Sequence, residues 1–281
     1  MEHLRSLIRS CCRAGVLEVA ITGGEPLIYP EIFSLMDQIR NCRMNVMIST
    51  NGMLVTHEIA QKLAALGVME TRVSFEGCRE VNDGIRGNGT YDRALRAIEH
   101  LVDTGNRTVC RLTLSRRSEE SLDHLFADLQ SRNARIVKVS VIKNSGRASD
   151  PENADLHGPK GDLACAKRLI EMGQRFGIEV QLSSDDFPVS AEEAKDGKLG
   201  ISGVQNCGAG TATAYVSPYG EVLPCSSIPQ IVFGNIRNDS FMRIWTGSTA
   251  MWFRKMAASS NERLICQAPC FRHVAEQICH L

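Results

Sequence analysis

The sequence lacks a long apolar run, a net charge and a dinucleotide-binding fingerprint, and each absence excludes a class of protein. No stretch approaches the ~20 consecutive apolar residues that span a bilayer, so we expect no membrane protein. The 281 residues include 32 basic and 32 acidic side chains, which removes any whole-surface attraction to nucleic acid or to an anionic membrane. The glycines of "ITGGEP" do not form G-x-G-x-x-G, so a nucleotide-dependent dehydrogenase is disfavoured.

The N-terminal segment also lacks the continuous apolar core of a secretory signal. Residues 1–15 instead predict an amphipathic helix, because Leu4, Leu7, Ile8 and Cys11 share one helical face. We therefore expect a cytoplasmic protein.

Up to about residue 180 the sequence alternates between β-branched runs, glycine-containing turns and helical patterns. Five runs read as strands: "LEVAITGG", "NVMISTNG", "TRVSFEG", "RTVCRLTLS" and "RIVKVSVIKN". Between the second and third runs, Thr56 is a candidate helix N-cap and Gly67 a candidate stop. This order predicts an α/β fold with parallel strands and right-handed crossovers. A partial (β/α) TIM-like barrel is our preferred topology, and an open doubly wound sheet is the competing one.

The pattern changes near residue 180. Residues 181–206 are polar and glycine-rich, and we interpret them as a linker or covering loop. "TATAYVSPYGEVLPC" predicts a β-hairpin, and residues 239–259 predict one helix capped by Asp239 or Ser240. The expected domains are thus a barrel over 1–180 and a small cysteine-rich α+β extension over 207–281.

The predicted strands end in residues that suit a small polar ligand. Gly23 and Gly24 allow close backbone approach, and Glu25 offers a carboxylate to an ammonium group. The next two strands end in "STNG" and "SFEG". Any one of these turns alone also fits ordinary βα turn chemistry, which favours the same residue types.

Taken in order, "TGGEPL", "STNG", "SFEG" and "NDGIRGNGTYDRAL" resemble the motifs of radical S-adenosylmethionine (radical SAM) enzymes. The resemblance implies that the GGE segment contacts the methionine end of the cofactor, with the acid on its amino group. It places the later serine and asparagine positions along the ribose and carboxylate, and Glu76 replaces the more common aspartate of that family. The cofactor-binding residues so implied are Gly23, Gly24, Glu25, Ser49, Asn51, Ser74 and Glu76.

One family motif is absent from the sequence: the CxxxCxxC loop that binds the catalytic four-iron cluster upstream of GGE. Only Cys11 and Cys12 precede Glu25, and adjacent cysteines cannot copy that spacing. We expect a truncation that removes the first strand and the cluster loop, with a natural protein without radical chemistry as the alternative. As printed, the chain is expected not to cleave S-adenosyl-L-methionine, and its catalytic residues are unassigned.

Eleven cysteines are many for a reducing compartment, where a disulfide framework is disfavoured. Six are scattered through apolar segments and predict small buried side chains. The C-terminal group resembles the SPASM or twitch extension, since Cys207 and Cys225 flank Gly220 with its spacing. The resemblance implies one auxiliary 4Fe-4S cluster, and a structural zinc site is the alternative. The candidate ligands are Cys207, Cys225, Cys266, Cys270 and Cys279.

The resemblance implies an oxidoreductase or maturase that generates a 5′-deoxyadenosyl radical and modifies a peptide or protein. Small-molecule or tetrapyrrole cofactor biosynthesis is the second candidate. A third is a non-catalytic, degenerate barrel that binds a peptide partner and carries structural zinc. The expected partners are the peptide or small-molecule substrate and an electron donor such as a flavodoxin or ferredoxin, without nucleic acid or membrane.

Overall fold

The computed structural model describes residues 2–119, 121–142, 150, 163–182 and 208–259. The chain divides into two compact units, one spanning Leu17–Val204 and the other combining Met1–Val16 with Gln205–Leu281. Each unit is described by itself. Among the described residues, no helix has the length and apolar character to cross a membrane.

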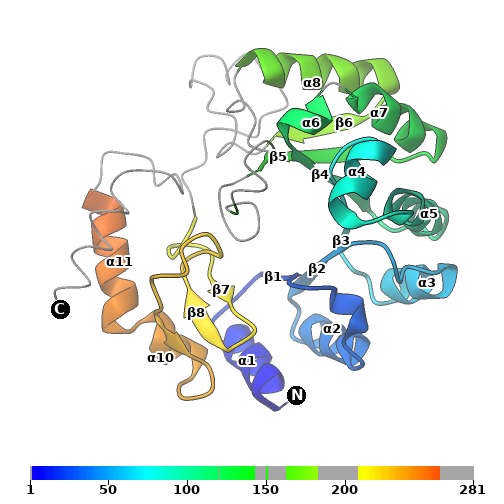
Figure 1. Ribbon diagram of the computed structural model, residues 1–281. Coiled ribbons are helices and arrows are strands. Elements are labelled where there is room, and N and C mark those ends of the chain that lie inside the picture. The colour runs from blue at the N-terminus through cyan, green and yellow to red at the C-terminus, as the bar shows by residue number, and fades with distance from the viewer. Residues whose placement is uncertain (1, 120, 143–149, 151–162, 183–207, 260–281) are drawn as a thin grey trace. The chain divides into compact units, whose positions relative to one another are not determined.

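The first unit is built on a six-stranded parallel sheet whose strands follow one another in chain order (Figure 1). Its strands are β1 (Glu18–Ile21), β2 (Asn45–Thr50), β3 (Glu70–Phe75), β4 (Thr108–Leu114), β5 (Ile136–Val141) and β6 (Glu179–Leu182). Within the described residues the sheet does not close, because β1 and β6 pair on one side only. The fold is therefore α/β with an open, partial TIM-like barrel, as predicted.

Helices connect successive strands and lie along one face of this sheet (Figure 1). Right-handed crossovers between strands in sequential order require this arrangement. The helices are η1 (Pro26–Ile28), α2 (Ile32–Asn41), α3 (His57–Ala65), α4 (Arg79–Arg86), α5 (Thr90–Asp103), α6 (Arg116–Glu119), α7 (Leu122–Ser131) and α8 (Leu163–Phe176).

The two faces of the sheet differ because side chains alternate along each strand. Toward the helices, β3 presents Val73 and Phe75, and both are fully buried. Toward the other side it presents Arg72 and Ser74, which are half-buried. We call these the helix face and the polar face. The split follows from the sequence, in which apolar and polar residues alternate on β3, β4 and β5.

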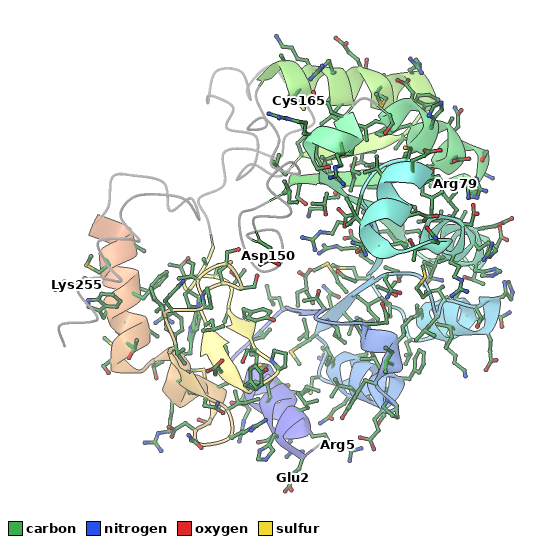
Figure 2. The ribbon with its side chains drawn as sticks, in the orientation of Figure 1. Glu2, Arg5, Arg79, Asp150, Cys165 and Lys255 are labelled. Carbon is green, nitrogen blue, oxygen red and sulfur yellow. The ribbon has the colours of Figure 1, made fainter. Side chains whose placement is uncertain are left out.

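Local sequence signals set several helix boundaries. The Thr56 hydroxyl accepts a hydrogen bond from the Ile59 backbone N–H at 3.2 Å, which confirms the predicted N-cap of α3. Gly67 has a positive φ of 62° directly after that helix, as a stop residue should. On α4, Arg79 (Figure 2) pairs with Asp92 of α5 and lies over the Tyr91 ring.

The sixth strand was not among the five predicted. β6 holds only four residues, "EVQL", and the sequence after it is polar and glycine-rich. An alternation this short is too weak a signal to predict a strand. The pairing of β6 with β5 through Val180 and Leu182 nevertheless buries both side chains.

The second unit contains a three-stranded antiparallel sheet of β7 (Tyr215–Val216), β8 (Glu221–Leu223) and β9 (Gly234–Asn235). The β7–β8 pair confirms the predicted hairpin, and β9 was not predicted. Two helices follow, α10 (Phe241–Trp245) and α11 (Ser248–Ser259), where one helix was expected. Ser240 is the N-cap of α10, accepting from the Arg243 N–H at 3.4 Å.

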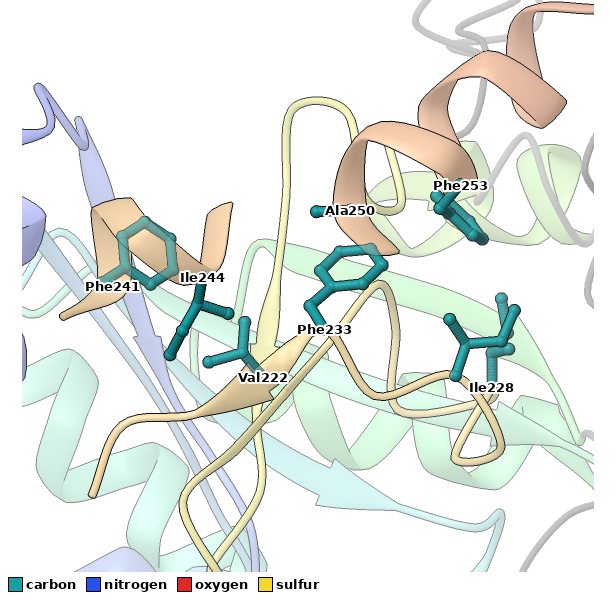
Figure 3. Close-up of a cluster of buried hydrophobic side chains, with 8 residues drawn as sticks. Val222, Ile228, Phe233, Phe241, Ile244, Ala250 and Phe253 are labelled. Carbon is teal, nitrogen blue, oxygen red and sulfur yellow. The ribbon is translucent and has the colours of Figure 1, made fainter. Parts of the chain in front are cut away.

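Aromatic and aliphatic side chains from β8, from the segment between β8 and β9, and from both helices form the core of this unit (Figure 3). Phe233 lies at its centre, with its ring 5.5 Å from that of Phe253 and 6.4 Å from that of Trp245. Trp245 in turn stacks on Phe241. The buried members are Val222, Ile228, Ile231, Phe233, Phe241, Ile244, Ala250 and Phe253.

The N-terminal helix belongs to this second unit. α1 (Glu2–Arg13) is amphipathic as predicted, and it packs against α10. Leu7 and Cys11 contact the apolar cluster, and Ile8 is buried. The compact units thus differ at the N-terminus from the expected barrel over 1–180, because the apolar face of α1 is covered by C-terminal residues. The division of the chain into functional domains stays a prediction.

Candidate cofactor and cluster sites

Glu25 lies at the carboxyl end of β1, as the N-cap of the 3₁₀ helix η1. One carboxylate oxygen, Oε1, accepts from the Leu27 N–H at 3.2 Å and from the Thr50 hydroxyl at 2.7 Å. The other oxygen, Oε2, accepts from the Asn51 N–H at 2.7 Å. The carboxylate is therefore fixed between the ends of two neighbouring strands.

These contacts leave the carboxylate room for a ligand. An ionised carboxylate has about four acceptor positions, and three are used by Leu27, Thr50 and Asn51. The remaining one is on Oε2. A ligand ammonium can donate a charge-assisted hydrogen bond to Oε2. The contacts with Leu27, Thr50 and Asn51 already hold the carboxylate in place for it.

The Gly23–Gly24 corner leaves the backbone accessible beside Glu25. Gly23 has a φ of 132°, which side chains rarely adopt, and both glycines are exposed. A Cβ placed on either glycine would meet no atom within 4 Å. Packing therefore does not explain the missing side chains, and open space beside an extended strand end suits a close-lying ligand.

Ser49 and Ser74 lie on the polar face, each one residue before the end of its strand. Both are half-buried, and among the described residues neither hydroxyl has a hydrogen-bond partner. Asn51 directly follows β2, and its side-chain oxygen accepts from the Met53 N–H at 2.8 Å. The structure thus brings these hydroxyl and amide groups to one edge of the sheet, together with Glu25.

Glu76 is held differently from the other predicted cofactor residues. It follows β3, and its Oε1 accepts from Arg86 at 2.6 and 2.9 Å. Its side chain is 12% exposed. Burial raises the pKa of the Glu76 carboxyl, and the Arg86 guanidinium acts against that rise. The Glu76–Arg86 pair makes this carboxylate an anchor for α4 as well as a candidate ligand contact.

Asn82 and Asp83, from the fourth motif, lie within α4 and not at a strand end. Asn82 is fully buried and accepts from the Glu76 N–H at 3.1 Å. Asp83 accepts from the N–H groups of Gly89 and Tyr91, both at 2.8 Å. These two residues shape the loop around Glu76, which is a structural role.

Among the predicted cluster ligands the structure describes only Cys225. Its sulfur accepts from the Ser227 N–H at 3.4 Å, a contact that favours a thiolate ligand. In the described ranges no three His, Cys, Asp or Glu side chains gather as a metal site. The remaining candidates lie outside the described residues: Cys207, Cys266, Cys270 and Cys279.

The loop that follows Cys207 in sequence lies beside the Cys225 turn. The Gly210 N–H donates to the carbonyl of Pro224, the residue before Cys225, at 3.2 Å. The residue types and this loop contact fit an iron–sulfur site to which both segments contribute.

Two contacts that position these sites escaped sequence reasoning. Thr50 orients Glu25, and its hydroxyl also accepts from the Gly52 N–H at 3.1 Å. Arg254 donates to the carbonyls of Gly210 and Trp245, at 2.9 and 2.7 Å, and its guanidinium lies 4.0 Å from the Trp245 ring centre. The "STNG" motif indicates a polar strand end, but nothing in sequence marks Arg254.

Of the six scattered cysteines, three are buried and three are half-buried. Cys110 is fully buried on the helix face of β4, and burial raises the pKa of its thiol. Burial also raises the pKa of Cys11 to about 11, with a smaller contribution from Cys12. The structure thus confirms burial for Cys78, Cys110 and Cys165.

Two family models match the chain. The radical SAM superfamily model covers residues 1–129, and the iron–sulfur cluster-binding domain model covers residues 207–271. They identify S-adenosyl-L-methionine and 4Fe-4S clusters as cofactors of the family, and the second match favours iron–sulfur over structural zinc.

Three curated proteins with named activities are similar in sequence to this chain. Mycofactocin maturase MftC of Mycobacterium tuberculosis is 33% identical over 88% of this chain, and MftC of Mycobacterium ulcerans is 30% identical over 91%. The AdoMet-dependent heme synthase of Methanosarcina barkeri is 29% identical over 91%. The chain covers 63%, 68% and 75% of these relatives, respectively.

A solved structure shares the fold. Streptococcus suis SuiB, bound to S-adenosylmethionine, superimposes with a TM-score of 0.69 and 19% identity, over 91% of this chain and 60% of SuiB. SuiB has also been solved with its precursor peptide SuiA. The chain belongs to the radical SAM superfamily. Within it, the chain is of the type that carries a C-terminal SPASM iron–sulfur domain.

Proposed function

We propose that this chain is the cofactor-binding and substrate-binding part of a radical SAM maturase that modifies a peptide. The observation that carries the proposal is the Glu25 carboxylate, held by Thr50 and Asn51 with one acceptor position left. That position suits the ammonium of an amino acid moiety. With the catalytic cluster of the family, S-adenosyl-L-methionine supplies a 5′-deoxyadenosyl radical that takes a hydrogen atom from substrate.

The residues of the chain bind and orient the cofactor in this proposal. Gly23 and Gly24 give backbone access to its methionine end, and Glu25 takes its ammonium group. Ser49, Ser74 and Asn51 supply hydroxyl and amide groups toward its ribose and carboxylate. Glu76 completes the set from the end of β3, where Arg86 holds it.

Cysteines in the second unit hold one auxiliary 4Fe-4S cluster in this proposal. The contact between Gly210 and Pro224 supports a site shared by Cys207 and Cys225. Cys266, Cys270 and Cys279 are the candidates for the other two positions, since a four-iron cluster takes four thiolates. When bound, such a cluster would supply an electron acceptor for the substrate radical or a contact that positions the substrate. The expected electron donor of the cytoplasmic enzyme is a flavodoxin or ferredoxin.

The peptide substrate class rests on relatives, and the heme synthase supports a second candidate, a tetrapyrrole. Peptides encoded by short reading frames beside the gene, synthesised with a fluorescein label, test the first class by fluorescence anisotropy. Protoporphyrin IX tests the second by its absorption shift. Saturable binding of a peptide and none of protoporphyrin supports the proposal, and the reverse pattern would overturn it.

The printed sequence contains no CxxxCxxC. We therefore propose that the 281-residue chain, taken alone, binds the cofactor but does not cleave it. A non-catalytic peptide-binding protein with zinc in its tail is the remaining alternative, and the metal content of the purified chain separates the two.

A further inference from the structure

The polar face of the sheet carries three cations on three neighbouring strands. Arg72 is on β3, Arg111 on β4 and Lys138 on β5. Arg111 and Lys138 occupy partner positions in the β4–β5 register, and Ser74 is the partner of Arg111 on β3. Since neighbouring strands are ~4.8 Å apart, their side chains emerge side by side on one face.

Carboxylates in this region are already engaged. Glu70 is buried and pairs with Arg72 through Oε1, while its Oε2 lies 3.6 Å from Arg107 Nε. Glu76 is taken by Arg86 and also lies in the field of Arg111.

On the far side of Lys138, the directly opposite residue on β6 is neutral. This partner is Gln181, whose amide donates to the Glu179 carboxylate at 2.8 Å.

Lys138 is the member of the row without an acid of its own. It is half-buried, and no described residue forms an ion pair or hydrogen bond with its ammonium group. Burial lowers the pKa of Lys138, as do Arg72 and Arg111, while Glu70 and Glu18 oppose the shift from a distance. Holding an uncompensated charge beside two like charges costs free energy, and a bound anion removes that cost.

We infer that Lys138, beside Arg111 at the β5 end of this row, binds a carboxylate of the substrate on the polar face of the sheet. This inference deepens the proposed function and rests on it for the location of the substrate. A carboxylate suits the site because it supplies the negative charge that no described acid pairs with Lys138. Arg72 is the register partner of Ser49 and Arg111 that of Ser74, so the row is level with these cofactor-assigned serines and continues away from Glu25 to Lys138 on β5.

The position also fits a specificity role. Lys138 is the third residue of β5, three residues before that strand ends. Through Arg111 it is level with Ser74 on β3, and two strand spacings of ~4.8 Å place it roughly 10 Å across the sheet from that serine. A carboxylate held there fixes one end of a substrate while the reacting carbon reaches across the sheet toward the residues assigned to the cofactor. The carboxylate can belong to an acidic side chain or to a peptide C-terminus.

Nuclear magnetic resonance of the full chain tests the inference at Lys138 itself. Reductive methylation with ¹³C labels each lysine Nζ and keeps its charge, and the Lys138 signal is assigned by its loss in Lys138→Met. The probes are acetylated trialanine as the free acid, its C-terminal amide, and an amidated tripeptide with a central glutamate. The free acid or the glutamate peptide should shift the Lys138 signal saturably, and the trialanine amide should not. Lys62, an exposed lysine paired with Glu58, serves as the control.

Two further variants separate ligand binding from a structural role. Lys138→Met should leave the melting temperature unchanged or raise it, because an uncompensated charge is removed. Lys138→Glu should raise it and abolish the response to carboxylates, since the new carboxylate lies beside Arg111. Binding of the free acid should weaken at least about tenfold in Lys138→Met, as for loss of a charge-assisted contact.

Several results would overturn the inference. They are no shift with any peptide, an equal shift with inorganic phosphate, or a shift caused by S-adenosyl-L-methionine in place of the peptides. A clear loss of stability in Lys138→Met would show a structural lysine. Cofactor binding at Glu25 is measured separately, by comparing the affinity of the wild type and Glu25→Gln for S-adenosyl-L-methionine, so the failure of this inference and of the proposed function are distinguishable.

Discussion

At the scale of single residues, the central feature is a carboxylate whose orientation depends on a residue 25 positions away. Thr50 donates to Glu25 from the end of β2 and is 2% exposed. A hydrogen bond to a charged group contributes about 1.5–3 kcal/mol. The ligand-facing oxygen of Glu25 is therefore in place before a ligand arrives.

Replacing Thr50 should weaken cofactor binding without touching the cofactor. Thr50→Val keeps the shape of the side chain and removes its hydroxyl, so Glu25 loses one of its three contacts. We expect roughly tenfold weaker binding of S-adenosyl-L-methionine in equilibrium dialysis. Thr50→Ser retains the hydroxyl and should bind almost as the wild type does. Equal affinity in the valine variant would show that Thr50 does not position Glu25.

Cys11 provides a pH-dependent test of packing in the second unit. Its folded pKa is about 11, against an ordinary value near 8.5 for an unfolded thiol. The folded state therefore keeps the proton to higher pH, so the free energy of unfolding falls as pH rises from about 8.5 to 11.

Alkylation by iodoacetamide, followed by mass spectrometry in a Cys12→Ser variant, measures this shift directly. The Cys11 thiol of the native protein should react slowly at pH 8.5 and quickly only above pH 10. In urea it should react at both pH values. Rapid alkylation of the native protein at pH 8.5 would contradict the burial of Cys11.

At the scale of elements, the N-terminal helix α1 packs with residues from the opposite end of the chain. It precedes the parallel sheet, yet its apolar face packs with α10 and the C-terminal cluster. Helices gain most of their stability from such packing of an amphipathic face. The second unit therefore depends on residues from the opposite end of the chain.

Shortening one buried side chain of α1 should destabilise the second unit. Ile8 is 5% exposed, and Ile8→Ala should cost about 2–4 kcal/mol of unfolding free energy. Hydrogen exchange should accelerate in α10 and less so in β3, and the exposed residue His3 offers His3→Ala as a control. Unchanged exchange in α10 would separate α1 from this unit.

The elements also show what the sequence could and could not predict. Strongly alternating strands and the Thr56 cap were predictable, because their signals are local. The break between α10 and α11 was not, since the apolar pattern continues across it. A Cβ at Gly247 would lie 3.1 Å from the Arg243 carbonyl, a constraint that only the folded backbone reveals. The Glu25–Thr50 contact likewise joins residues that sequence patterns treat separately.

At the scale of the whole molecule, the family match and the fold agree on a radical SAM protein with a SPASM domain, and the site residues remain our proposal. If the catalytic cysteines lie outside the printed sequence, the 281-residue chain should form no 5′-deoxyadenosine. Anaerobic incubation with iron, sulfide, dithionite and S-adenosyl-L-methionine, followed by chromatography, measures this product. Product above a protein-free control would mean that other residues of the chain hold a catalytic cluster.

The same reconstituted sample tests the auxiliary site. A 4Fe-4S cluster gives broad visible absorption, and Cys225→Ser should reduce that absorption and the bound iron together. Cys42→Ser, outside the proposed ligand set, should leave both unchanged. Stoichiometric zinc in the purified chain and no absorption after reconstitution would favour the zinc alternative.

Calorimetric titration of S-adenosyl-L-methionine into the full chain tests the central claim most directly. The wild type and Glu31→Gln, which changes an exposed carboxylate on the neighbouring turn, should bind the cofactor with the same affinity. Glu25→Gln should bind it roughly 10–100-fold more weakly, since the charge that meets the ligand ammonium is gone. Undiminished binding in Glu25→Gln, or no binding by the wild type, would contradict a cofactor site at these strand ends.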